Sequence, residues 1–130
     1  MHREGDVVTV VTWGAMVYTA DEAATVVESE DGLSVEIIDL RTIIPWDKEA
    51  VLTSVAKTSK VVVLHEDTHT GGFGAEIAAT IADEAFETLD APVRRITAPD
   101  APVPFSPPLE KAFIPQVDDV VAGIRELAAY

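Results

Sequence analysis

The 130-residue sequence has no cysteine, no long apolar run and few basic side chains. The lack of cysteine excludes disulfides and thiolate chemistry, and it agrees with an expected cytoplasmic location. No apolar run approaches the roughly 20 residues that span a bilayer. The opening segment Met1–Gly5 also lacks the apolar stretch of a signal peptide. We therefore expect neither a membrane protein nor a secreted one.

The scarcity of basic residues leaves the chain strongly acidic. Nine basic and 23 acidic side chains give a formal net charge of −14 at pH 7. Such a surface repels nucleic acid phosphates and anionic lipids, so neither nucleic acid nor a membrane is an expected partner. A basic protein partner is compatible with this charge, although acidic residues also serve solubility alone.

Apolar segments alternate with helical patterns along the chain. Strands are predicted at 7–13, 34–40, 60–64 and 93–97, and runs apolar on both faces are typical of a covered parallel sheet. Helices are predicted at 15–29, after Asp47, from Phe73 to Ala85 or Phe86, and from about Val117 onward. This alternation predicts one α/β domain over residues 1–130, a three-layer αβα sandwich with a mostly parallel sheet and helices on both faces.

The string His65-Glu66-Asp67-Thr68-His69 matches the zinc-protease pattern HExxH. That chemistry needs a helix, because only there do two histidines four residues apart share a face. The string follows a predicted strand directly, and on an extended chain the two histidines lie roughly 13 Å apart. A zinc peptidase is therefore the least favoured interpretation, and no metal ligands are expected.

A glycine-rich turn, Gly71-Gly72-Phe73-Gly74, joins that strand to the next helix. Such a turn can hold a phosphate through its backbone N–H groups, and an independent nucleotide-binding domain is one alternative. The spacing matches neither established phosphate-binding motif, however, and Glu66, Asp67 and Glu76 repel an anion. We favour glycines that permit a tight turn and close packing.

Three further features carry no chemistry of their own. Arg41 is one of few cations in an acidic chain, which predicts a paired, partly buried guanidinium. Trp46, beside Pro45, either anchors an interface or covers the core. The segment from Pro99 to Pro115 contains six prolines and is predicted to run over the surface to the last helix. No catalytic or cofactor-binding residues are expected, so the residues alone indicate a domain without a self-sufficient active site.

Five segments, in order, resemble one known family: DVVTVVTWG (6–14), VEIIDLRTIIPWD (35–47), VVVLHEDTHTGGFGAEIA (61–78), APVRRITAPDAPVPFSPPLEKAFIPQV (91–117) and the closing helix to Tyr130. They resemble the carboxy-terminal, transketolase-type domain of the β-subunits of thiamine-dependent 2-oxoacid dehydrogenases. The resemblance covers nearly the whole chain. It looks closer to the branched-chain (2-oxoisovalerate) enzymes than to the pyruvate enzymes.

The resemblance implies a whole enzyme that decarboxylates a branched-chain 2-oxoacid on thiamine diphosphate and passes the acyl group to lipoamide. In the family, the α-subunit holds the diphosphate and Mg²⁺, and the amino-terminal domain of the β-subunit holds the aminopyrimidine. The sequence has no GDG motif of the kind that signals the metal–diphosphate site. We therefore expect a fragment or a separately made domain that binds no cofactor and is inactive alone.

The resemblance also implies partners: the α-subunit and a second β-subunit in an α₂β₂ heterotetramer, and the basic subunit-binding domain of the lipoyl acyltransferase. Candidate residues for the subunit interface are Arg41, Trp46, His65, Glu66, Gly71, Gly72 and Gly74. Candidates for acyltransferase docking are Asp100 and the terminal carboxylate of Tyr130. Two alternatives stay open: a free-standing protein-binding domain without catalysis, and a β-subunit of the pyruvate or acetoin type.

Overall fold

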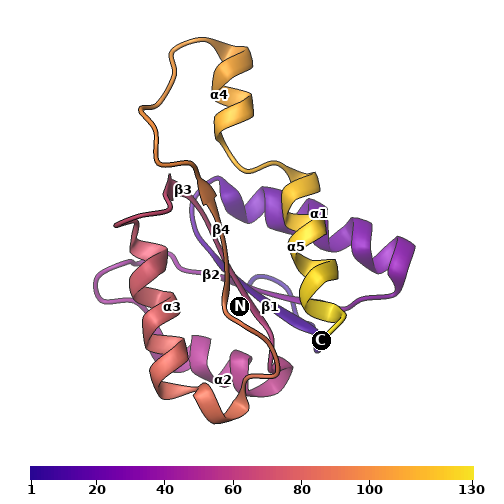
Figure 1. Cartoon of the computed structure of the whole chain (residues 1–130). Coiled ribbons are helices and arrows are strands. Elements are labelled where there is room, and N and C mark those ends of the chain that lie inside the picture. Colours follow the sequence, from indigo (N-terminus) through magenta and orange to yellow (C-terminus); the bar gives the residue numbers. More distant parts are fainter.

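The computed structural model describes residues 1–130, and its core is a sheet of four parallel strands in the order β2–β1–β3–β4 (Figure 1). The strands are β1 (Val8–Thr12), β2 (Val35–Asp39), β3 (Val61–Thr68) and β4 (Arg94–Ala98). The helices are α1 (Met16–Asp31), α2 (Lys48–Thr58), α3 (Phe73–Glu84), the short 3₁₀ turn η1 (Phe86–Thr88), α4 (Pro107–Phe113) and α5 (Val117–Ala128). None of the helices is long and apolar enough to cross a membrane.

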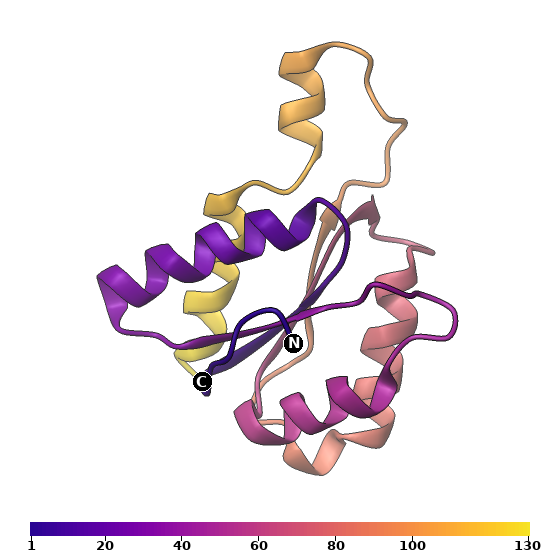
Figure 2. The same ribbon diagram turned by 180° about the vertical axis from the view of Figure 1, so that it is seen from behind.

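Helices cover both faces of the sheet, as Figures 1 and 2 show from opposite sides. Successive strand residues point to opposite faces, so Val8 and Val10 of β1 pack with α1 and α5, whereas Val11 packs with α2 and α3. All five residues of β1 are buried, as expected of a central parallel strand. The predicted three-layer α/β sandwich is therefore confirmed, and the sheet proper is wholly parallel.

The amino-terminal segment covers the outer edge of β2. Arg3 forms an antiparallel bridge with Ile37, with backbone hydrogen bonds in both directions. Its side chain also reaches α1, where it pairs with Asp21 at 3.2 Å and with Glu28. The first residues are thereby fixed to one strand and one helix.

Two elements differ from the expectations. The third helix ends at Glu84, so Ala85 is buried but Phe86 is largely exposed, rather than continuing the apolar face. The proline-rich stretch contains a short helix, α4, that was not predicted. Pro107 and Pro108 occupy its first positions, where a missing N–H costs no intrahelical hydrogen bond.

A buried carboxylate lies between the sheet and α2. Glu36, the second residue of β2, is 1% exposed and accepts hydrogen bonds from Ser54 at 2.6 Å and from the N–H of Gly5 at 3.3 Å. It also forms an ion pair with Lys57. The hydroxyl of Thr9 extends the network to Ser54 at 2.7 Å. These bonds join the amino-terminal segment, the sheet and α2 through one buried polar cluster.

Candidate functional site

The strand order places a switch point between β1 and β3. The chain passes from β1 to β2 on one edge side of β1, and then crosses over to β3 on the other edge side of β1. Open α/β sheets usually bind ligands in the crevice at the carboxyl ends of such strands. Here Trp13, directly after β1, stacks on His65 of β3 with ring centroids 5.2 Å apart. Phe73 meets Trp13 edge-on at 6.1 Å. The chain's own aromatic side chains therefore fill this position.

His65 is the polar member of this cluster and is almost fully buried, at 1% exposure. Neither ring nitrogen has a hydrogen-bond partner. Burial lowers the pKa of His65 from its ordinary 6.5, and the positive charge of Arg95 lowers it further against the opposing effect of Asp67. The neutral imidazole therefore serves as a packing surface for Trp13, and a charged imidazolium is disfavoured in this position.

This burial predicts a pH-dependent stability. Because the folded-state pKa lies below the unfolded value, the unfolded chain binds the proton more readily, so stability is full above pH 6.5 and falls as the pH drops below it. Urea unfolding of the wild type between pH 8 and pH 5 should show this decline. His65→Phe, which keeps an aromatic ring on Trp13, should flatten it, whereas His2→Gln at the exposed terminus should not. Equal slopes in all three proteins would contradict the assignment.

The glycines after β3 make room for this histidine. Gly71 has a φ of +76°, a left-handed conformation that favours glycine. A Cβ atom on Gly72 would collide with the carbonyl oxygen of Thr68, and one on Gly74 would collide with the ring of His65. The interpretation of a tight turn with close packing is therefore confirmed. Gly72 and Gly74 were predicted to form or support the subunit interface. Both are buried, so they can support neighbouring residues of such an interface but cannot contact a partner themselves.

The HEDTH string lies on an extended chain, because β3 continues to Thr68. His65 is buried within the strand, while His69 lies exposed in the following turn and Glu66 is exposed on the strand. The guanidinium of Arg95 contacts Nε2 of His69 at 2.8 Å. Because arginine only donates, Nε2 must accept, which places the ring proton on Nδ1, 3.2 Å from the hydroxyl of Thr97. The two histidines thus have separate environments and do not form the helical arrangement of the zinc motif.

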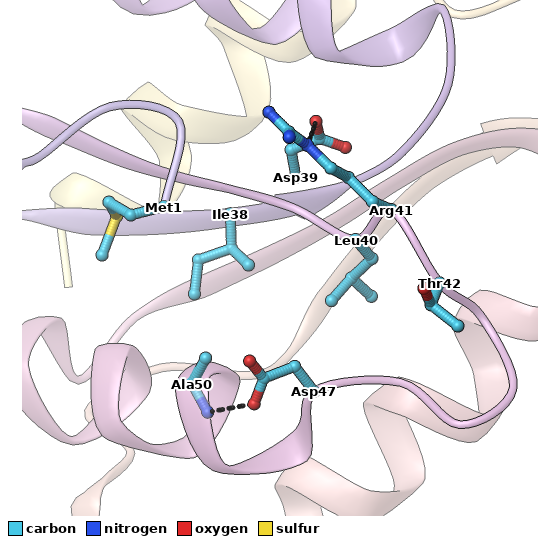
Figure 3. Close-up of a pocket in the computed structure, with 8 residues that line it drawn as sticks. All are labelled: Met1, Ile38, Asp39, Leu40, Arg41, Thr42, Asp47 and Ala50. Atoms are coloured by element: carbon cyan, nitrogen blue, oxygen red, sulfur yellow. Dashed lines mark hydrogen bonds and ion pairs between the residues drawn. The ribbon is translucent and has the colours of Figure 1, made fainter.

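Arg41 borders a shallow pocket at the carboxyl end of β2 (Figure 3). The pocket encloses about 410 Å³ and is lined by Met1, Ile38, Asp39, Leu40, Arg41, Thr42, Asp47 and Ala50. The expectation of a partly buried guanidinium is wrong, because the side chain is 87% exposed and only its Nε meets Asp39, at 3.3 Å. Within this lining, the carboxylate of Asp47 accepts a hydrogen bond from the N–H of Ala50 and thereby caps α2. Trp46 is half-buried and packs against the core cluster formed with α2 and α3, so of its two predicted roles the structure shows the covering of the core, and a role at an interface stays a prediction.

The two docking candidates lie at opposite ends of the sheet. Asp100 follows the carboxyl end of β4, where its carboxylate accepts hydrogen bonds from the backbone and hydroxyl of Thr70, at 2.8 and 2.6 Å. These bonds lower the pKa of Asp100. Tyr130 lies at the other end, next to Ala128, whose carbonyl accepts from Lys60 at the start of β3. The structure therefore does not bring Asp100 and Tyr130 into one site.

A second surface was missed by sequence reasoning and lies at the amino end of the sheet. A groove of about 860 Å³ runs between α3 and the chain that enters β4, lined by Ala78, Ala79, Ala82, Phe86, Glu87, Leu89, Asp90, Ala91, Pro92 and Val93. Phe86 is 73% exposed at its rim. Asp90 is anchored by its N–H to the carbonyl of Ser59, adjacent to Lys60, and so lies at the same end as Tyr130. The sequence feature that could have indicated this groove is an aromatic residue, followed by acidic residues, just after the end of α3.

Comparison with known proteins places these features in a family context. The family model described as "Transketolase, C-terminal domain" matches residues 1–120. The chain is 44% identical to the 2-oxoisovalerate dehydrogenase subunit beta of Bacillus subtilis, over 98% of this chain and 39% of that protein. It is 43% identical to the acetoin:2,6-dichlorophenolindophenol oxidoreductase subunit beta of the same organism, over 96% and 36%. It is 40% identical to the pyruvate dehydrogenase E1 component subunit beta of Rickettsia felis, over 98% and 39%.

A solved structure agrees with these sequence matches. The chain superposes on a protein described as "Split gene transketolase, inactive beta4 tetramer" with a TM-score of 0.77 and 28% identity, covering 98% of this chain and 40% of that one. The chain thus spans about two fifths of the length of the relatives it matches.

Proposed function

Because the chain belongs to the family of transketolase carboxy-terminal domains, we propose that it is the assembly and docking domain of the β-subunit of a thiamine diphosphate-dependent 2-oxoacid dehydrogenase. The relatives at 40–45% identity are named as β-subunits of such enzymes or of the acetoin enzyme. In this proposal the domain contacts the α-subunit and a second β-subunit, and it receives the acyltransferase. Catalysis belongs to the assembled enzyme.

The observation that carries this proposal is the filled switch point. Trp13, His65 and Phe73 occupy the position where an α/β sheet would bind a cofactor. The exposed carboxylates of Glu66 and Asp67 flank the nearby turn and would repel a diphosphate. No three metal-binding side chains converge to hold the accompanying Mg²⁺. These residues do not fit thiamine diphosphate, so we assign no step of the reaction to them.

The amino end of the sheet is the better candidate for acyltransferase docking. Tyr130 lies at the same end of the sheet as Asp90 and Glu87, and these two acidic residues line an apolar groove that carries the exposed ring of Phe86. An apolar centre with a charged rim is the usual composition of a protein interface. Acidic rim residues would steer a basic domain toward this surface. We therefore propose this surface in place of Asp100, whose carboxylate is already bound to Thr70.

A matched pair of double variants tests the docking surface. Glu87→Gln/Asp90→Asn should weaken binding of the purified subunit-binding domain by about tenfold at low salt, because it removes two charges from the rim. Glu66→Gln/Asp100→Asn removes the same charge at the other end of the sheet and should change binding little. Calorimetry at low and high salt is the measurement, and wild-type binding should weaken as salt rises. Equal losses in both variants would indicate net charge alone and contradict a local site.

We also propose the branched-chain (2-oxoisovalerate) type, supported by relatives of that name at 44–45% identity against 40–43% for those named after pyruvate and acetoin. The chain should be used as bait to capture its complex from a lysate of the source organism. The captured complex should then be assayed with 2-oxoisovalerate, pyruvate and acetoin in parallel. The highest kcat/KM with 2-oxoisovalerate is the expected result. A preference for pyruvate or acetoin would replace this assignment and leave the docking role intact.

A further inference from the structure

The stretch from Pro99 to Pro115, which we call the arm, leaves the body of the domain at the carboxyl end of β4 and returns to the start of α5. Figures 1 and 2 show from opposite sides that it projects beyond the sheet, with α4 at its far end. The side chain of Gln116 fixes its return by donating to the carbonyls of Lys111 and Ile114, at 2.9 and 2.7 Å. The base of the arm is therefore anchored, whereas its tip stands away from the domain.

The tip of the arm exposes apolar side chains. Val103 and Leu109 are 64% and 60% exposed, and Phe105 is completely exposed. No residue of α4 is buried. A helix of seven residues is marginal in water without tertiary packing, so the body of this chain supplies little of what stabilises it. This arrangement is typical of a segment that packs against another polypeptide.

The charge of the arm differs from that of the rest of the domain. The arm contains two acidic residues and one basic residue, whereas the remaining 113 residues contain 21 acidic and eight basic ones. Permanent subunit interfaces are apolar and poor in charge, whereas a transient basic partner would select the acidic groove at the amino end. The two ends of the sheet therefore suit two partners of different chemistry.

We infer that the arm is the anchor for a permanently associated subunit, and that Val103, Phe105 and Leu109 insert into an apolar, weakly charged groove of that subunit. This inference rests on the proposed function, under which the subunit is the dehydrogenase α-subunit. A second copy of this chain is disfavoured as the occupant, because its strongly acidic body offers a poor match to the apolar, weakly charged tip of the arm. The acyltransferase binds elsewhere, at the opposite end of the sheet.

The test measures binding of the full 130-residue chain to the purified α-subunit from the same source, by calorimetry or light scattering. Phe105→Ser/Leu109→Ser should weaken binding by more than about tenfold, since buried aromatic anchors commonly contribute that much. Phe86→Ser removes an exposed aromatic ring at the other end and should leave the affinity unchanged. The arm variant should unfold at the wild-type urea midpoint, because both side chains are exposed. Wild-type binding should persist at high salt.

The other outcomes separate the inference from the function on which it rests. If the wild type and the arm variant bind the α-subunit equally, the arm is not the anchor, although the assembly role stands. If the wild type binds the acyltransferase domain but no α-subunit, the arm inference is overturned and the docking role remains. If the arm variant instead abolishes a dimer of this chain, the occupant is a second copy and the inference is wrong.

Discussion

Lys57→Met should lower the free energy of unfolding by about 2–3 kcal/mol, because it leaves the carboxylate of Glu36 buried without an opposite charge. Breaking a buried ion pair by removing one partner costs about 3–5 kcal/mol. We expect less here because the Lys57 side chain is 47% exposed, so water already solvates part of the pair. Methionine keeps the apolar stem, which limits the loss to the charge. Urea unfolding at pH 7 is the measurement.

Two further variants isolate the pair. Glu36→Gln together with Lys57→Met should recover about half of the lost stability, since the amide oxygen still accepts hydrogen bonds and no charge remains buried. Lys111→Met, on the exposed arm, should leave stability unchanged. If Lys57→Met were as stable as the wild type, Glu36 would have to be solvated and the buried network would be an incorrect description.

The same network contributes to acid sensitivity. Burial alone would raise the pKa of Glu36, but hydrogen bonds from Lys57, Ser54 and the Gly5 N–H outweigh it and hold the pKa below the ordinary 4.5. The stabilisation is therefore complete above pH 4.5 and is lost as the pH falls through the folded-state value. This loss begins below pH 4.5, whereas that of His65 begins below pH 6.5, so the two losses have different onsets in one pH series.

Gly74→Ala should destabilise the domain by about 1–3 kcal/mol, the usual cost of extra volume in a packed core. The new methyl group would enter the space of the His65 ring, which is held between Trp13 and the helix backbone. Alanine is intrinsically about 1 kcal/mol better than glycine within a helix, so a net loss would show that packing dominates. Thermal and urea unfolding of the purified variant provide the measurement.

A compensating change tests the steric cause. In a His65→Ala background the ring is absent, so Gly74→Ala should become neutral or stabilising, a coupling that two independent sites would not show. Gly71→Asn is the matched control in the same turn, because asparagine tolerates the left-handed conformation that Gly71 adopts. Additive losses at positions 65 and 74 would show that the glycine is required for another reason.

Much of the fold could be predicted because its signals are local. The valine runs of β1 and β3 have to be buried on both faces, which implies a covered parallel sheet. Glu36 was not recognised as buried, because a single carboxylate in a strand usually marks the solvent face, and its partner Lys57 comes from a different element. The α4 helix was missed because prolines normally indicate its absence, although two at the first positions are compatible with it.

The candidate site was predicted less completely, because it depends on contacts between distant residues. The stacking of Trp13 on His65 joins two strands whose adjacency depends on the strand order, which one sequence does not specify. Asp100 and Tyr130 are both near the carboxyl terminus, yet α5 runs back along the sheet and carries Tyr130 to the opposite end. The positions of Asp90 and Phe86 likewise follow from where α3 stops.

The bridge between Arg3 and Ile37 has a consequence for solubility. A bare edge strand is a template on which further chains add to form fibrils. The amino-terminal segment occupies that template on β2, while β4 at the other edge begins with consecutive arginines, whose charges oppose pairing with another such strand. Removing the first six residues would uncover the Val35–Asp39 edge, so resistance to fibril formation is expected to depend on a segment that contributes little to the hydrophobic core.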